Sequence, residues 1–253
     1  MTEELLSLRA LVVSREDGLR QLFRQATAFS SVPIELVEAA DPASACGLLE
    51  DDGQRCDFAY LDGALPVAEI AQVVRTVRAA TKPPFSILLA TSAAAVAFAT
   101  DAVAGKPSRL EESRWLLERS KRVRLPSRVL VVDDSATMRT IVRKALSATR
   151  FPFEVSEIGD GLTALKLLRE GEFDLVFLDQ NMPDLSGLET LAELKREQRR
   201  ASVVMMTSAA DETLVKRARE LGAAFLKKPF FPGDVEAALC SYYGLRVLHP
   251  NRP

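Results

Sequence analysis

Apolar runs of strand length alternate along the chain with segments in which apolar residues recur at helical spacing. A buried parallel strand is a short continuous apolar run, whereas a helix that packs on a sheet carries a single apolar stripe. The alternation predicts an α/β fold in which helices cover both faces of a parallel sheet. The predicted strands are residues 11–13, 34–37, 58–61 and 85–89 in the first half, and residues 129–132, 153–155, 175–178, 203–206 and 223–226 in the second.

The second half of the chain repeats the first. The segment LVVSREDGLRQLF, which begins at residue 11, parallels LVVDDSATMRTIV at residue 130, an offset of 119 positions. Asp62 parallels Asp179 at an offset of 117, and Thr91 parallels Thr207 at an offset of 116. Small changes of offset are typical of loop insertions between two copies of one supersecondary pattern. We therefore predict two tandem domains of the same topology.

The boundary between the two domains is predicted from a helix stop. The length of 253 residues suits two ordinary domains. A helical segment at residues 108–125, whose end is basic, is followed by Pro126, and proline cannot continue a helix. The predicted domains are therefore residues 1–126 and residues 127–253.

Composition narrows the class of protein. Apolar residues make up 47% and charged residues 27% of the sequence, with a net charge of −2, as in a globular protein with a full core. This balance does not favour direct binding to DNA or to a membrane. Three cysteines without metal-ligand spacing and a single histidine argue against structural zinc and favour a reducing, cytoplasmic location.

In the second half, aspartate, threonine or lysine lies just beyond the end of four of the five predicted strands. Asp133 and Asp134 follow the first run, Asp179 the third, Thr207 the fourth and Lys228 the fifth. Because the carboxyl ends of parallel strands lie along one edge of a sheet, where ligands bind, we expect these side chains to meet. The alternative is that each aspartate only begins a turn or caps a helix, which does not explain why four runs end in this way.

The types of these residues predict a magnesium site and an aspartate nucleophile. Three carboxylates in one crevice repel one another, and a divalent cation removes that cost. A site that offers only oxygen ligands suits Mg²⁺. Asp179 is then free to form an aspartyl phosphate. Lys228 would offset the charge of the incoming phosphoryl group, and Thr207 would donate a hydrogen bond to it.

The motifs DDSATMR, LDQNMPDLSG, MTS and FLKKPF, all between residues 128 and 245, resemble those of the CheY-like receiver domain of two-component response regulators. The resemblance implies two flavodoxin-like (βα)5 domains, each with a parallel five-stranded sheet of order 2-1-3-4-5. Phe225 matches the switch aromatic, although it could equally be an ordinary residue of an edge strand. The other roles implied by the resemblance are Asp179 as phosphoacceptor and metal ligand, Asp134 as direct metal ligand, Asp133 as ligand through water, Asn181 as ligand through its backbone carbonyl, Thr207 as switch hydroxyl and Lys228 as phosphate-binding lysine.

The first half departs from this pattern. Ser14 and Arg15 replace the acidic pair, which removes the expected metal ligands, whereas Asp62, Thr91 and Lys106 persist. Arg15 is expected to reach Asp62 as a fixed cation in place of a metal. We therefore interpret the first half as a degenerate receiver domain.

The interval before the lysine also differs between the halves. Thr91 and Lys106 are 15 positions apart, whereas Thr207 and Lys228 are 21 positions apart. The fourth helix of the first domain is therefore expected to be shortened or absent. The shorter interval leaves open whether Lys106 is equivalent to Lys228.

The resemblance implies a response regulator that takes a phosphoryl group from a sensor histidine kinase or a phosphotransfer protein and then changes its contacts with other proteins. Only the residues GLRVLHPNRP follow the last predicted helix, so we expect no output domain and no enzyme activity beyond the protein's own phosphorylation and dephosphorylation. Three alternatives remain: a phosphorelay intermediate or phosphate sink, an Mg²⁺-dependent aspartyl-phosphate phosphatase, and a scaffold that never takes phosphate. The sequence also allows a homodimer.

Overall fold

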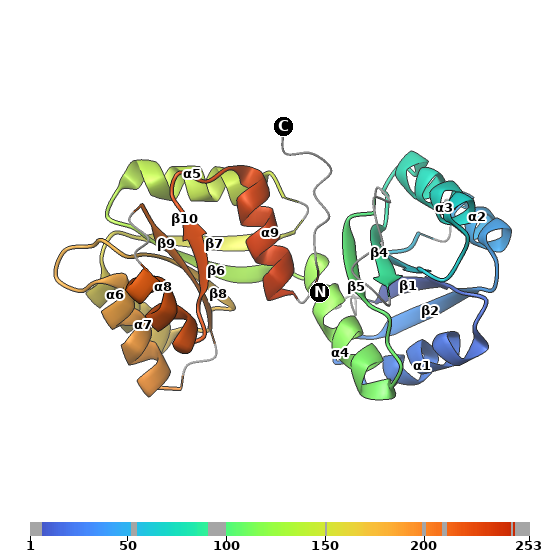
Figure 1. The fold of residues 1–253 in the computed structure, drawn as a ribbon, viewed down its shortest axis with the longest axis horizontal. Coiled ribbons are helices and arrows are strands. Elements are labelled where there is room, and N and C mark those ends of the chain that lie inside the picture. The colour runs from blue at the N-terminus through green and yellow to red at the C-terminus, as the bar shows by residue number, and fades with distance from the viewer. Residues whose placement is uncertain are drawn as a thin grey trace, which may run out of the picture. The chain divides into compact units, whose positions relative to one another are not determined.

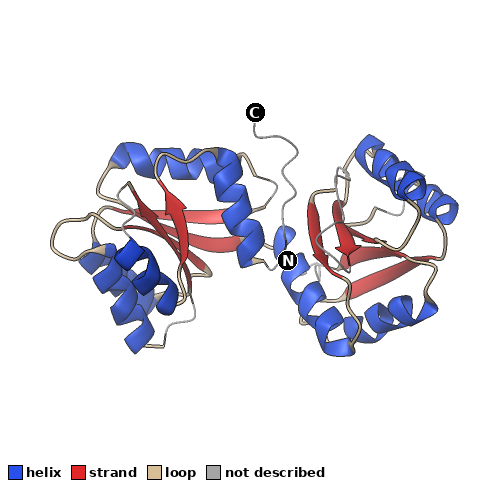
Figure 2. Cartoon of the chain, viewed as in Figure 1, coloured by secondary structure: helices blue, strands red, loops and turns tan. Residues whose placement is uncertain are grey.

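A computed structural model of the chain describes residues 7–51, 55–90, 100–149, 151–198, 201–208, 212–243 and 245. The chain divides into a first unit, residues 1–124 with residues 243–253, and a second unit, residues 125–242. Each unit has one five-stranded sheet with helices against both of its faces (Figure 1, Figure 2). No helix in the described part of the chain is both long enough and apolar enough to cross a membrane.

In the first unit the strands lie in the order β2-β1-β3-β4-β5, and all neighbours are parallel. This order confirms the predicted 2-1-3-4-5 sheet. The strands are β1 (Leu8–Val13), β2 (Ile34–Ala39), β3 (Phe58–Asp62), β4 (Phe85–Ala90) and β5 (Ala102–Gly105). The helices are α1 (Asp17–Thr27), α2 (Pro42–Glu50), α3 (Val67–Ala79) and α4 (Leu110–Ser120), followed by the 3-10 turn η1 (Lys121–Val123).

The second unit has the same topology, with strand order β10-β9-β8-β6-β7 and parallel neighbours throughout. Read from the other edge, this is again the order 2-1-3-4-5 within the unit. The strands are β6 (Ser127–Val132), β7 (Phe153–Ile158), β8 (Leu175–Asp179), β9 (Ser202–Thr207) and β10 (Ala224–Lys227). The helices are α5 (Ala136–Ser147), α6 (Gly161–Glu170), α7 (Gly187–Arg196), α8 (Glu212–Glu220) and α9 (Pro232–Tyr242).

The central strand of each sheet is buried along its whole length and ends in an aspartate. β3 has the sequence FAYLD and β8 the sequence LVFLD, and every residue of both strands is buried. A strand covered by helices on both faces must be apolar throughout, so the carboxylates of Asp62 and Asp179 are exceptions at the end of each run. Each of them is therefore a buried charge that needs partners.

Two elements of the first unit differ from the sequence-based expectation. β5 is absent from the predicted strands, because its four residues AVAG are too few and too rich in alanine to be distinguished from a helical segment. The helix expected over residues 108–125 ends at Ser120 and continues only as the single turn η1. The expected shortening of the fourth helix concerns residues 91–99, which lie outside the described residues.

The start of α7 is packed directly against the end of β8. A Cβ atom on Gly187 would lie 2.3 Å from the backbone oxygen of Asp179, which is closer than any real contact, so only glycine fits there. The helix begins with a reciprocal capping box between Ser186 and Glu189. The loop between Asp179 and α7 is thus held at both of its ends.

The three cysteines, Cys46, Cys56 and Cys240, are buried and form no disulfide bond within the described residues, and burial raises the pKa of Cys56 to about 11. Because a thiol reacts as its thiolate, we expect Cys56 in the native protein to react roughly a hundredfold more slowly with a disulfide reagent at about pH 8 than free cysteine does. Thiol titration before and after unfolding in guanidinium tests this. Rapid modification of the native protein would show that these thiols are not protected.

Candidate functional site

Three carboxylates meet at the carboxyl edge of the second sheet. Val132 of β6 pairs with Leu178 of β8, so the residues that follow, Asp133 and Asp179, leave neighbouring strands side by side. Asp133, Asp134 and Asp179 each offer an oxygen atom within 4.8 Å of the others. Asp133 and Asp179 are buried, whereas Asp134 is exposed. The three acidic residues expected to meet from the sequence therefore do so.

Lys228, which directly follows β10, bridges the two buried carboxylates. Its Nζ lies 2.6 Å from Oδ2 of Asp133 and 2.7 Å from Oδ1 of Asp179. Burial disfavours the charged ammonium, but the hydrogen bonds to Asp133 and Asp179 outweigh this and raise the pKa of Lys228. Burial also raises the pKa of Asp179; the hydrogen bond and charge of Lys228 only partly offset this, and the negative charge of Asp133 adds to the rise. The cluster thus carries more negative than positive charge.

The remaining partners of the carboxylates are backbone N–H groups. Asn181 donates its N–H to Oδ2 of Asp179 at 3.1 Å, and Ser135 donates its N–H to Oδ1 of Asp133 at 3.0 Å. These bonds orient the carboxylates and leave an all-oxygen donor set on three residues with excess negative charge. That set fits Mg²⁺, which prefers oxygen ligands and retains several waters.

Thr207 lies on β9, the neighbour of β8, and Phe225 lies on β10, the edge strand that follows β9 in the sheet. Thr207 is the fully buried last residue of β9, and its carbonyl accepts the N–H of Lys228 at 2.8 Å. This bond places Thr207 next to the residue that carries the bridging ammonium. Phe225 of β10 pairs with Met205 of β9 and is partly buried against the core of the unit, a position that suits either of its predicted roles.

Arg139, which the sequence-based predictions did not include, holds the loop that carries the acidic pair. Its Nη1 donates to the carbonyl oxygens of Asp133 at 2.7 Å and Asp134 at 3.3 Å. In the first unit, Arg20 donates in the same way to the carbonyl of Ser14. The two arginines are 119 positions apart, which is the offset of the repeated segment. A comparison of the polar positions within the repeat would therefore have found them.

In the first unit, Asp62 is the counterpart of Asp179, and its carboxylate is contacted by a lysine and a serine hydroxyl. Nζ of Lys106 lies 2.9 Å from Oδ1 of Asp62, and the hydroxyl of Ser14 donates to Oδ2 of Asp62 at 2.6 Å. The N–H of Ala64 completes the set at 3.0 Å. Lys106 follows β5 directly, as Lys228 follows β10. Despite the shorter interval, Lys106 therefore lies at the same position relative to its strand and to its central aspartate as Lys228 does in the second unit.

Arg15 does not reach Asp62, contrary to the sequence-based expectation. Its Nη2 donates instead to both carboxylate oxygens of Glu69, at 2.8 and 3.0 Å. Asp62 is already satisfied by Ser14, Lys106 and a backbone N–H, and its side chain is only 2% exposed. The guanidinium of Arg15 is therefore not needed to neutralise Asp62, whose carboxylate is buried and already bonded. The second carboxylate partner of Lys106 is Glu16, at 2.7 Å, a residue that is not among the predicted site residues.

Strand register identifies Ala90 as the counterpart of Thr207. Asp62 pairs with Leu89, and Asp179 pairs with Met206, so the next residue is Ala90 in one sheet and Thr207 in the other. The carbonyl of Ala90 accepts the N–H of Lys106 at 3.0 Å, as that of Thr207 does from Lys228. Thr91, which the repeat aligns with Thr207, lies outside the described residues. At this register the first unit has a methyl group where the second has a hydroxyl.

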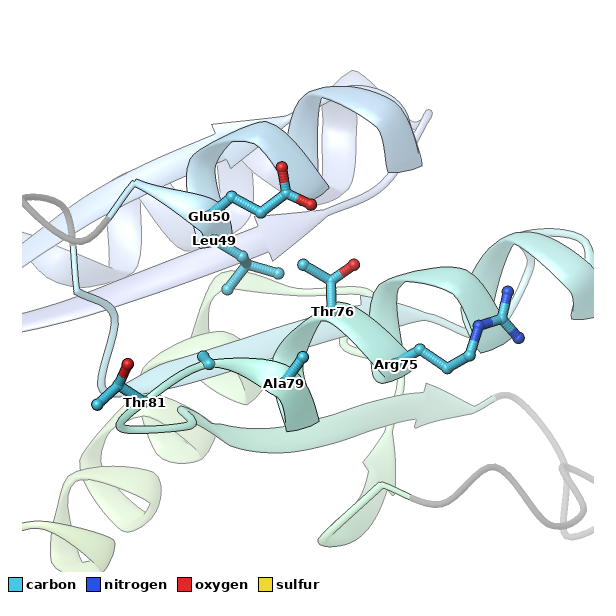
Figure 3. Close-up of a pocket in the computed structure, with 7 residues that line it drawn as sticks. Leu49, Glu50, Arg75, Thr76, Ala79 and Thr81 are labelled. Carbon is cyan, nitrogen blue, oxygen red and sulfur yellow. The ribbon is translucent and has the colours of Figure 1, made fainter.

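A separate hollow of about 440 Å³ lies between α2 and α3 of the first unit (Figure 3). It is lined by the final turns of the two helices, at the sheet edge opposite to Asp62. Its charged lining residues, Glu50 and Arg75, form no ion pair with each other in the described part of the chain. The hollow therefore lacks the converging polar groups of the carboxylate cluster.

Comparisons with known proteins concern mainly the second unit. A family model described as the response regulator receiver domain matches residues 129–240. The chemotaxis protein CheY-3 of Vibrio cholerae serotype O1 is 36% identical over 115 residues, which are 44% of this chain and 88% of that protein. The cyclic di-GMP phosphodiesterase response regulator RpfG of Xanthomonas campestris pv. campestris is 30% identical over 147 residues, 57% of this chain and 39% of that protein.

Some solved structures extend over both units. The structure of a probable two-component system response regulator/GGDEF domain protein covers 93% of this chain and 97% of its own, with a TM-score of 0.53 and 22% identity. At that identity the likeness is one of fold alone. It agrees with the tandem arrangement of two flavodoxin-like sheets.

Proposed function

Because this chain belongs to the receiver-domain family of response regulators, we propose that it accepts a phosphoryl group on Asp179 in a two-component signalling system. The proposal depends on the burial and the contacts of the Asp179 carboxylate. It is buried at the end of β8, lies beside Asp133 and Asp134, and receives the ammonium of Lys228 at 2.7 Å. A carboxylate oriented in this way, next to a cation site and a fixed positive charge, is placed to act as a nucleophile.

Asp133, Asp134 and Asp179 are the residues that would hold Mg²⁺, with the backbone carbonyl of Asn181 as a further ligand. When bound, Mg²⁺ would neutralise charge on the oxygens of the transferred phosphoryl group. The excess negative charge of the cluster favours a divalent cation over the ammonium of Lys228 alone. Lys228 could then turn from Asp133 toward the phosphoryl oxygens.

The proposed reaction is an in-line transfer from a histidine of another protein. An oxygen of Asp179 forms a bond to phosphorus while the phosphorus–nitrogen bond of the donor breaks, and the released imidazole takes up a proton. The N–H of Asn181, which now donates to Asp179, orients the attacking carboxylate. Lys228 and the hydroxyl of Thr207 stabilise the charge on the transferred group.

The proposed output is a change of binding surface on β9 and β10. Attraction of the Thr207 hydroxyl to the phosphoryl group would move the end of β9, and Phe225, which pairs with the same strand, would repack. Phe225 is only partly buried against the core of the unit, which supports a role for this residue in such a change. The same chemistry, run in reverse, would serve a phosphorelay intermediate or a phosphate sink, and in neither role is the protein an enzyme acting on other substrates.

The first unit is proposed to be a degenerate receiver domain. Within the described residues, the one cluster of three acidic groups that could hold a metal lies in the second unit. Ser14 occupies the position of Asp133, and Lys106 and Ser14 already satisfy Asp62. These contacts support a role in holding the fold or a partner rather than in phosphoryl transfer.

The test is Mg²⁺-dependent labelling of the whole chain with a small acyl phosphate. We expect intact-mass spectrometry to show one added phosphoryl group in the presence of Mg²⁺ and none when the metal is removed with EDTA, because phosphoryl transfer needs the cation charge. Beryllofluoride with Mg²⁺ should bind at the same stoichiometry. Labelling that is indifferent to EDTA, or turnover of unrelated phosphoesters, would refute the proposal.

A further inference from the structure

Arg139 lies in the first turn of α5, where a cation is disfavoured, and is paired there with a glutamate of the neighbouring strand. The N-terminus of a helix carries a partial positive charge, so a cationic side chain in its first turn costs free energy. Nε of Arg139 lies 3.6 Å from Oε2 of Glu157 on β7, and the two side chains are only 20% and 30% exposed. Glu157 therefore offsets the cost of placing a largely buried guanidinium at this helix end.

The other end of the same guanidinium holds the loop that carries the acidic pair. Nη1 of Arg139 donates to the carbonyl oxygens of Asp133 at 2.7 Å and of Asp134 at 3.3 Å. A guanidinium is planar and rigid, so a carboxylate beside one of its nitrogens fixes the directions of the remaining N–H groups. Glu157 thus fixes the position of Nη1, and through it the two carbonyls of the loop.

The orientation of these carbonyls decides where the two carboxylates point, because Asp133 and Asp134 share the peptide between them. The carboxylate of Asp133 has a further restraint, since Ser135 donates its N–H to Oδ1 of Asp133 at 3.0 Å. The carboxylate of Asp134 is exposed, and within the described residues no hydrogen bond or ion pair restrains it. Its direction therefore depends on the backbone that Arg139 holds.

The first unit contains the same arrangement without the acidic pair. Nε of Arg20 lies 3.6 Å from Oε2 of Glu38, and Nη1 of Arg20 donates to the carbonyl of Ser14. Arg20 and Glu38 each lie 119 positions before their counterparts, Arg139 and Glu157. The first unit therefore allows the effect of such a pair on the fold to be measured apart from its effect on a metal site.

We propose that Arg139 and Glu157 are positioning residues for the metal site, which set the backbone of residues 133–134 so that both carboxylates face one cation. Because it takes Asp133 and Asp134 as ligands of Mg²⁺, this role rests on the proposed function. The hydrogen bonds from Arg139 go to backbone carbonyls of these residues, so the arginine acts through the loop and is not a ligand itself. Groups that orient metal ligands in this way typically contribute a factor of about 10 to 100 in metal affinity.

Charge and positioning predict opposite effects for the loss of Arg139. The guanidinium is a positive charge beside the acidic loop, so Coulomb repulsion alone predicts that Arg139→Gln strengthens the binding of a cation. Positioning predicts weaker binding, because the loop loses the contact that orients its carboxylates. The direction of the change in affinity therefore distinguishes the two effects.

The test is titration of the full chain with Mg²⁺, followed by the NMR shifts of the backbone amides of the second unit. Arg139→Gln should raise the dissociation constant about tenfold or more. Glu157→Gln should also raise it, because the guanidinium loses the carboxylate that fixes its position. Arg139→Lys keeps the charge but not the planar set of donors, and it should not restore the affinity of the wild type.

Arg143→Gln is the matched control. Nε of Arg143 lies 3.0 Å from Oε1 of Glu157, so this arginine contributes the same charge to the same partner, one turn further along α5. Within the described residues it forms no hydrogen bond with the acidic loop. Its side chain is 54% exposed, so its loss should leave the dissociation constant within about twofold of the wild type.

A second measurement needs no metal. In the metal-free protein, hydrogen exchange of the Ser135 N–H, which is bonded to Asp133, should become about tenfold faster in Arg139→Gln, the effect of losing a charged hydrogen bond. In the first unit, Arg20→Gln should have the same effect on the N–H of Glu16, which is bonded to Oγ of Ser14 at 3.0 Å. Arg20→Gln should nevertheless leave the Mg²⁺ dissociation constant unchanged.

Unchanged or tighter Mg²⁺ binding by Arg139→Gln, in a protein whose wild type binds the metal, would overturn the positioning role and leave the proposed function intact. Weakening of equal size by Arg143→Gln would also overturn it, because the effect would then be one of surface charge. A wild type that does not bind Mg²⁺ would refute the proposed function and the positioning role together.

Discussion

Asp179→Asn is expected to abolish phosphoryl uptake by the whole chain, whereas Asp62→Asn should leave it unchanged. The asparagine keeps the shape of the side chain but loses the negative charge and the nucleophilic oxygen. Asp179 lies in a cluster with two further carboxylates, whereas Asp62 has the hydroxyl of Ser14 at the position of Asp133 and is already satisfied by Ser14 and Lys106. We therefore expect Asp179→Asn to lose all phosphoryl uptake and Asp62→Asn to lose none.

The two variants form a matched pair because both aspartates end a buried central strand and both bond to a lysine. Intact-mass measurement after treatment with a small acyl phosphate and Mg²⁺ gives the amount of label in each variant. Circular dichroism should show that both variants remain folded. Residual labelling of Asp179→Asn that disappears in the double variant with Asp62→Asn would show that the first unit also accepts phosphate.

Lys228→Met is expected to lower the free energy of unfolding of the second unit by about 3 kcal/mol in the absence of metal, because it leaves two buried carboxylates without their shared ammonium. Lys106→Met should lower that of the first unit by about 2 kcal/mol, since Asp62 keeps the hydroxyl of Ser14 and the N–H of Ala64. The two variants are expected to differ in how far Mg²⁺ restores the free energy of unfolding of the affected unit. Saturating Mg²⁺ should recover most of the loss in Lys228→Met and none in Lys106→Met.

Urea unfolding, followed in each unit by hydrogen exchange of its own peptides with and without Mg²⁺, measures these differences. Lys216→Met is the control, because Lys216 is an exposed residue of α8 and should change neither unit. Equal recovery of both lysine variants by Mg²⁺ would mean that the first unit also binds the metal. Failure to recover Lys228→Met would mean that the carboxylate cluster does not bind it.

Much of the fold followed from local patterns. The apolar runs that end in Asp62 and Asp179 were predicted as buried strands, because a strand that is apolar at every position is covered on both faces. The repeat between the halves indicated that both units share one topology. β5 was missed because four small residues carry too little periodicity to distinguish a strand from a helix.

The carboxylate cluster was predictable because a single rule governs it. Parallel strands end at one edge, so residues that follow β6, β8 and β10 meet there whatever the rest of the chain does. Arg139 was not predicted, because its contact with the carbonyls of Asp133 and Asp134 depends on the geometry of a loop. The sequence signal for Arg139 is the arginine at the equivalent position of the repeat, Arg20, 119 positions earlier.

By itself, the sequence determined the two parallel sheets, the edge at which Asp133, Asp134, Asp179 and Lys228 meet, and the loss of the acidic pair in the first unit. These features depend on periodicity and strand direction, which are local. Only the tertiary structure decided which cation satisfies Asp62, because Lys106 and Arg15 compete for it and the winner depends on space and on the nearby carboxylates of Glu16 and Glu69. The counterpart of Thr207 was likewise decided by strand register, in which a shift of one residue exchanges a hydroxyl for a methyl group.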